Sequence, residues 1–137
     1  MDASMVDKLP HVLKRLSDKK LPWDYFELSR NPGIAWEVVQ ANPNKPWDWI
    51  QLSMNPSITF DHIAANPGKP WNWEGLSRNT SITFDNVLAN PGKPWNWNRL
   101  SKNPSITWQV VEARPDKAWN WHGLSRNPSG HFRHRLR

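Results

Sequence analysis

A 24-residue period runs through most of this sequence and constrains its fold more than any other feature. Trp recurs at this interval at five positions, and a second aromatic residue stands two residues after each of them. The two series are Trp23, Trp47, Trp71, Trp95 and Trp119, and Tyr25, Trp49, Trp73, Trp97 and Trp121. A Leu-Ser pair follows in register, from Leu28-Ser29 to Leu124-Ser125. A fixed period without insertions is typical of repeat architectures, in which each unit packs on the next.

Each period contains two segments that favour short helices. The first follows Ser-Ile-Thr: Thr59 is a suitable N-cap, and Phe60 and Ile63 share one helical face. An Asn-Pro pair then ends this segment, because a residue before proline avoids the α region. The second segment is expected to begin at a proline and to run through Trp-x-Trp to Leu-Ser. The prolines in question are Pro46, Pro70 and Pro94.

Helices of about seven to nine residues are unstable alone in water, so these segments must pack against neighbouring repeats. The sequence therefore predicts an all-α fold, a solenoid of two-short-helix repeats over residues 23–128, about 4.5 units long. A β-solenoid is the competing interpretation, but the frequent prolines weaken it. Residues 1–22 carry apolar side chains at helical spacing and are expected to form an N-terminal capping helix. Residues 129–137 are expected to be a mobile basic tail.

The positive charge of the chain is concentrated at its two ends. The formal net charge is +6 over 137 residues. Residues 126–137 carry four Arg and no acid, whereas residues 23–125 carry nine basic and nine acidic side chains. Within that neutral array, residues 23–70 have a net charge of −2 and residues 71–125 of +2. An anionic partner is therefore expected to prefer the C-terminal half and the tail, because the array as a whole does not attract a phosphate backbone.

The composition limits both the core and the location of the chain. Eleven Trp compensate for a mean hydropathy of −0.80, and the sequence predicts a core built by stacking them. There is no Cys, which excludes disulfides, thiolate zinc sites and a cysteine nucleophile. No apolar run has the length of a membrane span or a signal peptide. We therefore expect an intracellular protein that is not secreted and has no membrane partner.

The recurring segment NPSITFDHIAANPGKPWNWEGLS at 55–77 resembles the tryptophan-rich tandem repeats found in proteins of giant DNA viruses. The resemblance covers residues 23 to 128, with PWDW and NPSITW as variants of the motif. It implies a viral origin and a setting in the cytoplasm of an infected host cell or in the virion. It carries over no catalytic residues.

Residues that differ between copies define a candidate binding surface. On a helical wheel of the second segment, the near-constant positions 49, 52 and 53 cluster, while positions 50, 51 and 54 and their equivalents form a variable arc. We expect this arc to face solvent and to contact a protein partner. Its candidate residues are Ile50, Gln51, Met54, Glu74, Arg78, Asn98, Arg99, Lys102, His122 and Arg126. The wheel leaves the Trp47 series either folded onto a neighbouring loop or exposed.

Nucleic-acid binding is the alternative function. Lysines two residues before the Trp series could follow a phosphate backbone while bases stack on the indoles. This alternative uses Lys69, Lys93, Lys117, Arg133, Arg135 and Arg137. The competing interpretation of the lysines is structural, with their stems covering indole faces and adding cation–π attraction. Carbohydrate binding on exposed Trp is a third hypothesis.

No catalytic group emerges from the sequence. The repeated Ser is expected to donate to a nearby backbone carbonyl, and the repeated Asn to satisfy backbone groups at helix ends. No His or carboxylate repeats in register with Ser to act as a base. His131 and His134 form a poor metal site on a tail. The sequence thus predicts a binding or structural module without enzyme activity, metal, cofactor or small-molecule substrate.

Overall fold

The structure is a computed structural model that describes residues 23–129 and divides them into two compact units, residues 23–71 and 72–129. The described residues form nine short helices and no strand, which confirms the predicted all-α class. The helices are α4 (Tyr25–Arg30), α5 (Trp36–Ala41), α6 (Trp49–Met54), α7 (Phe60–Ala65), α8 (Trp73–Arg78), α9 (Phe84–Leu88), α10 (Trp97–Leu100), α11 (Trp108–Ala113) and α12 (Trp121–Ser125). None of them is long and apolar enough to cross a bilayer. The predicted capping helix, and the tail beyond residue 129, lie outside the described residues.

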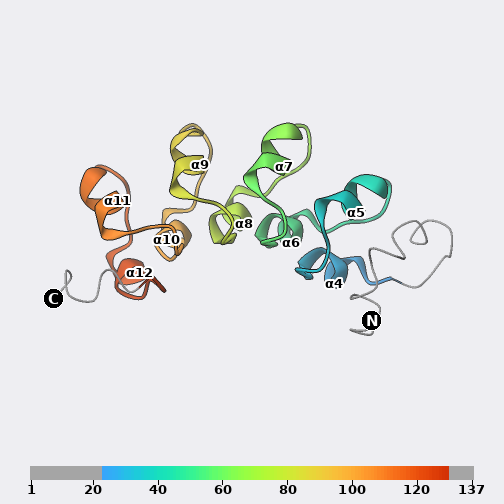
Figure 1. Cartoon of the computed structure of the whole chain (residues 1–137), viewed down its shortest axis with the longest axis horizontal. Coiled ribbons are helices and arrows are strands. Elements are labelled where there is room, and N and C mark those ends of the chain that lie inside the picture. The colour runs from blue at the N-terminus through green and yellow to red at the C-terminus, as the bar shows by residue number, and fades with distance from the viewer. Residues whose placement is uncertain (1–22, 130–137) are drawn as a thin grey trace. The chain divides into compact units, whose positions relative to one another are not determined.

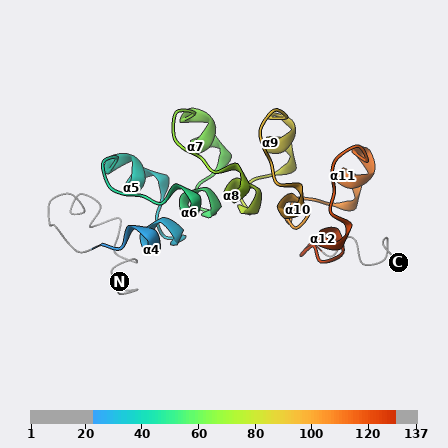
Figure 2. The same cartoon turned by 180° about the vertical axis from the view of Figure 1, so that it is seen from behind.

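Two kinds of helix alternate along the chain. We call α5, α7, α9 and α11 the A helices, and α4, α6, α8, α10 and α12 the B helices. In the first unit α4 and α6 lie side by side, and α5 and α7 both lie on one side of this pair (Figure 1). In the second unit the B helices α8, α10 and α12 form one row and the A helices α9 and α11 another, as the reverse view also shows (Figure 2).

The B helices begin later than the prolines predict. Each starts at the second aromatic residue of the Trp-x-Trp motif, and the residue between the two aromatics is the N-cap. Asp48 accepts a hydrogen bond from the Gln51 backbone N–H at 3.0 Å. The caps of the five helices are Asp24, Asp48, Asn72, Asn96 and Asn120. The expected start at Pro46 is therefore wrong, because Asp and Asn side chains satisfy the first free N–H groups of a helix, which proline cannot do.

The A helices begin and end close to where the sequence predicts. Thr83 and Asn86 form a capping box at the start of α9. The Thr83 backbone N–H donates to Asn86 Oδ1 at 2.8 Å, and the Thr83 hydroxyl accepts from the Asn86 backbone N–H at 3.4 Å. Thr59 stands before α7 in the same position. Three of the four A helices end one residue before the residue that precedes proline. All nine helices have four to six residues, shorter than the sequence suggests.

The deepest part of the core consists of aliphatic side chains rather than Trp. The repeated Leu of the B helices and the Ile before each A helix are completely or almost completely buried. These side chains are Leu28, Leu52, Leu76, Leu100 and Leu124, and Ile34, Ile58, Ile82 and Ile106. Trp49, Trp73 and Trp97 are only half-buried, and Trp121 is 54% exposed. The expectation of a core built by Trp stacking alone is thus corrected, because the repeated Leu and Ile side chains are buried more deeply than any indole.

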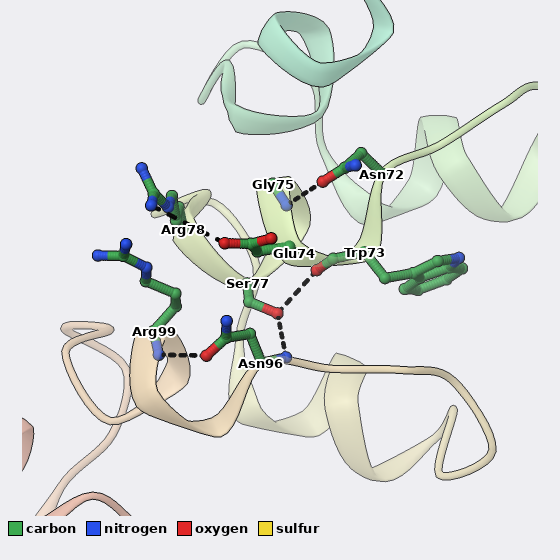
Figure 3. Close-up of polar contacts among 8 residues, drawn as sticks. All are labelled: Asn72, Trp73, Glu74, Gly75, Ser77, Arg78, Asn96 and Arg99. Carbon is green, nitrogen blue, oxygen red and sulfur yellow. Dashed lines mark hydrogen bonds and ion pairs between the residues drawn. The ribbon is translucent and has the colours of Figure 1, made fainter.

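Repeated polar side chains join successive repeats within each unit. Ser77 Oγ donates to the Trp73 carbonyl at 2.7 Å and accepts from the Asn96 backbone N–H at 2.9 Å (Figure 3). Asn127 Nδ2 donates to the carbonyls of Ser101 and Asn103 at 2.7 and 3.0 Å. Both hydroxyl and amide therefore have structural partners, as the sequence predicts for the Ser and Asn series. Such bonds satisfy backbone groups that short helices leave unpaired.

Candidate functional site

The variable positions of the B helices lie at the surface, as the wheel predicts. Seven of the ten candidate residues are exposed and three are half-buried. The exposed ones are Ile50, Glu74, Arg78, Asn98, Lys102, His122 and Arg126. The half-buried ones are Gln51, Met54 and Arg99. We call these ten residues the B-helix arc.

The arc is interrupted where the repeat carries glycine. Gly75 and Gly123 occupy the position of Gln51 and Arg99 but are buried. A Cβ on Gly123 would lie 3.2 Å from Ser101 Cβ, closer than an ordinary contact. The solvent exposure expected for these equivalent positions is therefore wrong at the two glycines, and at Gly123 the backbone lies close to Ser101 of the preceding repeat.

In the first unit, exposed apolar side chains include the arc residue Ile50 and Phe26, which lies outside the arc as defined. Phe26 and Ile50 occupy equivalent positions on α4 and α6, and their side chains are 45% and 52% exposed. The guanidinium of Arg30 lies 5.7 Å from the Phe26 ring centroid, and Glu27 lies 3.9 Å from the same Arg30. Large apolar side chains exposed on neighbouring helices are typical of contact surfaces.

The arc of the second unit is cationic and hollowed. Arg78, Arg99 and Lys102 line a cavity of about 200 Å³ together with uncharged residues: Ser77, Thr80, Asn103 and Pro104. Arg78 and Arg99 extend on the same side of their helices (Figure 3). Glu74 is the one acid bound to these cations among the described residues, at 3.9 Å from Arg78. Three cations and one acid leave an excess of positive charge at the cavity, which favours an anionic group.

Thr80 marks this cavity in the sequence. At the equivalent positions of the other copies the Asn is followed by proline: Pro32, Pro56, Pro104 and Pro128. Thr80 is exposed and adds a hydroxyl and a backbone N–H, two donors that proline lacks. The departure from Asn-Pro was visible in the sequence and could have drawn attention to Arg78 and its neighbours. That Thr80 lies beside the cavity, however, is known only from the fold.

Four members of the Trp47 series are buried and Trp23 is half-buried, which decides against the exposed alternative left open by the wheel. Trp47, Trp71, Trp95 and Trp119 all precede a B helix and are less than a tenth exposed. The Trp47 Nε1 donates to the Asn42 carbonyl at 2.8 Å, and the other three repeat this bond at the equivalent carbonyl. Each indole therefore folds back onto the end of the preceding A helix.

The second aromatic series packs edge-to-face against the first. The ring centroids of Trp49 and Trp71 are 5.2 Å apart at an interplanar angle of 85°. Tyr25 and Trp47, Trp73 and Trp95, and Trp97 and Trp119 pair in the same way. Burial raises the pKa of Tyr25 above its ordinary value. This edge-to-face geometry is the one that the quadrupoles of aromatic rings favour.

Two of the candidate lysines cover indoles. The Lys93 ammonium lies 5.3 Å from the Trp73 ring centroid, and that of Lys117 lies 5.9 Å from Trp97. Lys117 also lies 3.9 Å from an Asp116 carboxylate oxygen. These two contacts are of the kind that the structural interpretation of the lysines predicts. Lys69 is exposed and contacts no indole in this way within residues 23–129.

A cavity with indole walls occurs at the same place in both units. In the first unit its volume is about 220 Å³, and in the second about 50 Å³. The lining of the first consists of Trp36, Val39, Gln40, Pro43, Trp47, Trp49, Asn66 and Lys69. The lining of the second consists of Val87, Leu88, Pro91, Lys93, Trp95, Trp97 and Lys117. Six positions correspond after a shift of two periods, so one repeat geometry builds both cavities.

The remaining candidate groups have no described site. Within residues 23–129 there is no group of three or more His, Asp or Glu side chains that could hold a metal ion. His62 stacks on Trp36, with ring centroids 6.0 Å apart. Arg133, Arg135, Arg137 and the two tail histidines lie outside the described residues. The chain matches no protein-family model, no curated protein and no solved structure.

Proposed function

We propose that this chain is a non-enzymatic binding module, a solenoid of 24-residue two-helix repeats whose B-helix arc contacts a protein partner. The observation that carries the proposal is the cavity lined by Arg78, Arg99 and Lys102, three arc residues that two successive repeats bring together. The core positions of each repeat keep the same residues, while the arc changes from copy to copy. Such a division between constant core and variable surface suits a repeat protein that reads a partner.

The partner is expected to present acidic side chains to the second unit and apolar side chains to the first. Arg78, Arg99 and Lys102 would pair with carboxylates, with the planar guanidinium groups binding them most specifically. Phe26 and Ile50 would supply apolar contact area. An interface of this kind would bind with a salt-dependent association rate, because exposed charges steer the encounter.

The proposed setting follows from the resemblance of the repeat to tryptophan-rich repeats of giant DNA viruses. The partner would then be a viral or host protein in the cytoplasm of an infected cell or in the virion. A chain with a binding arc and no catalytic group would there act as a structural or interaction component.

Charge reversal on the arc tests the proposal. We expect a variant with Arg78→Glu, Arg99→Glu and Lys102→Glu to lose the partners that the unaltered chain captures from infected cells, as measured by quantitative mass spectrometry. A control with Lys45→Glu, Lys93→Glu and Arg114→Glu changes the net charge equally at positions off the arc, and should retain them. Equal capture by both variants would remove the arc from partner recognition.

Nucleic-acid binding is a second candidate because the second unit has a net positive charge and exposed cations. In this alternative Lys69, Lys93 and Lys117 act together with Arg133, Arg135 and Arg137. The positions of Lys93 and Lys117 over indoles argue against base stacking on those rings. The alternative predicts an affinity for DNA or RNA that falls steeply with salt and falls again when residues 130–137 are deleted. Unchanged affinity after that deletion would exclude the tail from binding.

A further inference from the structure

The indole-walled cavity of the first unit differs from its counterpart in the second unit in its volume and in the surroundings of its lysine. Its volume is about 220 Å³ against about 50 Å³, although six lining positions correspond. In the second unit Lys117 lies over Trp97 and contacts Asp116. The equivalent Lys69 lines the first cavity but lies over no indole and within 4.0 Å of no carboxylate among the described residues.

The sequence explains why Lys69 is free of an acidic neighbour. Gly68 precedes it, whereas Asp116 precedes Lys117. The second difference is at position 40, where Gln40 lines the first cavity and Leu88 the second. The first cavity thus combines an unpaired ammonium and two amide side chains, Gln40 and Asn66, with indole and aliphatic walls.

Three features of this lining define the ligand. Trp49 is half-buried and can contact another aromatic ring in offset or edge-to-face geometry, while Trp36 and Trp47 are less than a tenth exposed and complete the wall. The volume is below the range of about 300–1,000 Å³ that holds a drug-sized molecule, so one ring system fits. The single ammonium of Lys69 favours one negative charge and disfavours a cation.

We propose that this cavity binds a single aromatic ring that carries a carboxylate. The ring contacts the indoles, the carboxylate pairs with Lys69 Nζ, and the amides of Gln40 and Asn66 orient the polar end. Two sources offer this chemistry: a free aromatic acid and an aromatic residue at the C-terminus of a peptide. None of the lining residues belongs to the B-helix arc, so the site is independent of the proposed protein-binding function.

Indole N–H resonances of the full chain, labelled with ¹⁵N-Trp, report on this site directly. We expect indole-3-acetate to shift the Trp36, Trp47 and Trp49 signals saturably, with a dissociation constant on the order of 1 mM for a ligand of about a dozen heavy atoms. Indole-3-acetamide lacks the charge and acetate lacks the ring, and both should bind at least about ten-fold more weakly. N-acetyl-L-phenylalanine represents a peptide terminus. Tighter binding of indole-3-acetate identifies the free acid as the ligand, and the reverse order identifies the peptide.

Matched variants separate the two cavities. Lys69→Gln should lower the affinity for indole-3-acetate by about ten-fold, whereas Lys117→Gln should leave this affinity unchanged. Gly68→Asp should also weaken binding, because it gives Lys69 the acidic neighbour that Lys117 has. Gly92→Asp is the control, and neither glycine has an atom within 4 Å of an added Cβ, so both variants should fold.

The outcomes that overturn the proposal are equally specific. One is the absence of a saturable shift at concentrations well above the expected dissociation constant. Another is binding of indole-3-acetamide as tight as that of the acid. The third is an equal loss of affinity in Lys69→Gln and Lys117→Gln. Lys69 is exposed, so Lys69→Gln should fold normally. An indole N–H spectrum of ligand-free Lys69→Gln that matches the unaltered chain will confirm this.

Discussion

In the first unit the second residue of each B helix is Phe26 or Ile50, whereas in the second unit the same position carries Glu74, Asn98 or His122. The net charge changes with it, from −2 over residues 23–70 to +2 over residues 71–125. Both units nevertheless bury the same Leu and Ile positions completely or almost completely. The comparison indicates that the repeat keeps its fold with one set of residues and varies its surface chemistry with another.

The largest effects on stability are expected at the Leu position that each unit buries. Leu52→Ala and Leu100→Ala each remove a fully or almost fully buried side chain, one in each unit. Each substitution should lower the free energy of unfolding by about 2–5 kcal/mol, because a cavity remains. Urea unfolding followed by far-ultraviolet circular dichroism measures this, with exposed Ile50→Ala as the control, at less than about 0.5 kcal/mol. A much smaller loss at one Leu would mean that the two units do not depend equally on this position.

The second test concerns the buried Asn side chains that recur in both units. Asn55 Nδ2 donates to the carbonyls of Ser29 and Asn31 at 3.0 and 2.8 Å, and Asn127 makes the same pair of bonds in the second unit. Alanine at either position should cost about 2–3 kcal/mol, because buried carbonyls lose their donor. The measurement is again the free energy of unfolding. Losses that differ by more than about 1 kcal/mol would contradict equivalent roles, since such bonds vary within that range.

Smaller losses of stability are expected at the repeated Ser, and Ser125 in the last copy is the control. Ser101 Oγ accepts from the Asn120 backbone N–H at 2.9 Å and donates to the Trp97 carbonyl at 2.7 Å. Ser101→Ala should therefore cost about 1–2 kcal/mol. Ser125 is exposed and its Oγ donates to His122 in its own helix, so Ser125→Ala should cost less than about 0.5 kcal/mol. Thermal unfolding of both variants decides whether the bond between repeats, rather than the hydroxyl itself, is stabilising.

The period and the variable arc were predictable because both follow from one-dimensional spacing. Residues that recur at 24-residue intervals must occupy equivalent places, and Leu52 and Ser53 are indeed buried. The start of the B helices was not predictable with the same certainty. Pro46 and Asp48 are both helix-start signals, and only the bond from Gln51 to Asp48 shows that the cap takes precedence. Trp47 consequently lies before the helix, where a wheel does not apply.

The cavities could not be predicted because they depend on side chains from different repeats. Arg78 and Lys102 occupy equivalent positions in the sequence, but Arg99 belongs to another column of the wheel. Their convergence on one cavity follows from the packing of α8 against α10. Lys69, Lys93 and Lys117 occupy equivalent positions in the sequence, but only Lys93 and Lys117 lie over an indole among the described residues, a difference that the spacing does not reveal.

The smallest expected effect concerns Glu74, the acid paired with Arg78 beside the cationic cavity. Glu74→Gln removes an exposed ion pair with Arg78, so the free energy of unfolding should change by less than about 0.5 kcal/mol. The affinity for an acidic probe, hexaglutamate, should rise because Arg78 then faces no competing carboxylate. Glu27→Gln removes an ion pair of Arg30, which occupies the position of Arg78 in the first unit, and is the control. Isothermal titration at low salt measures both. If Glu27→Gln raises the affinity as much as Glu74→Gln, the gain comes from net charge alone, and the cationic cavity does not distinguish the second unit from the first.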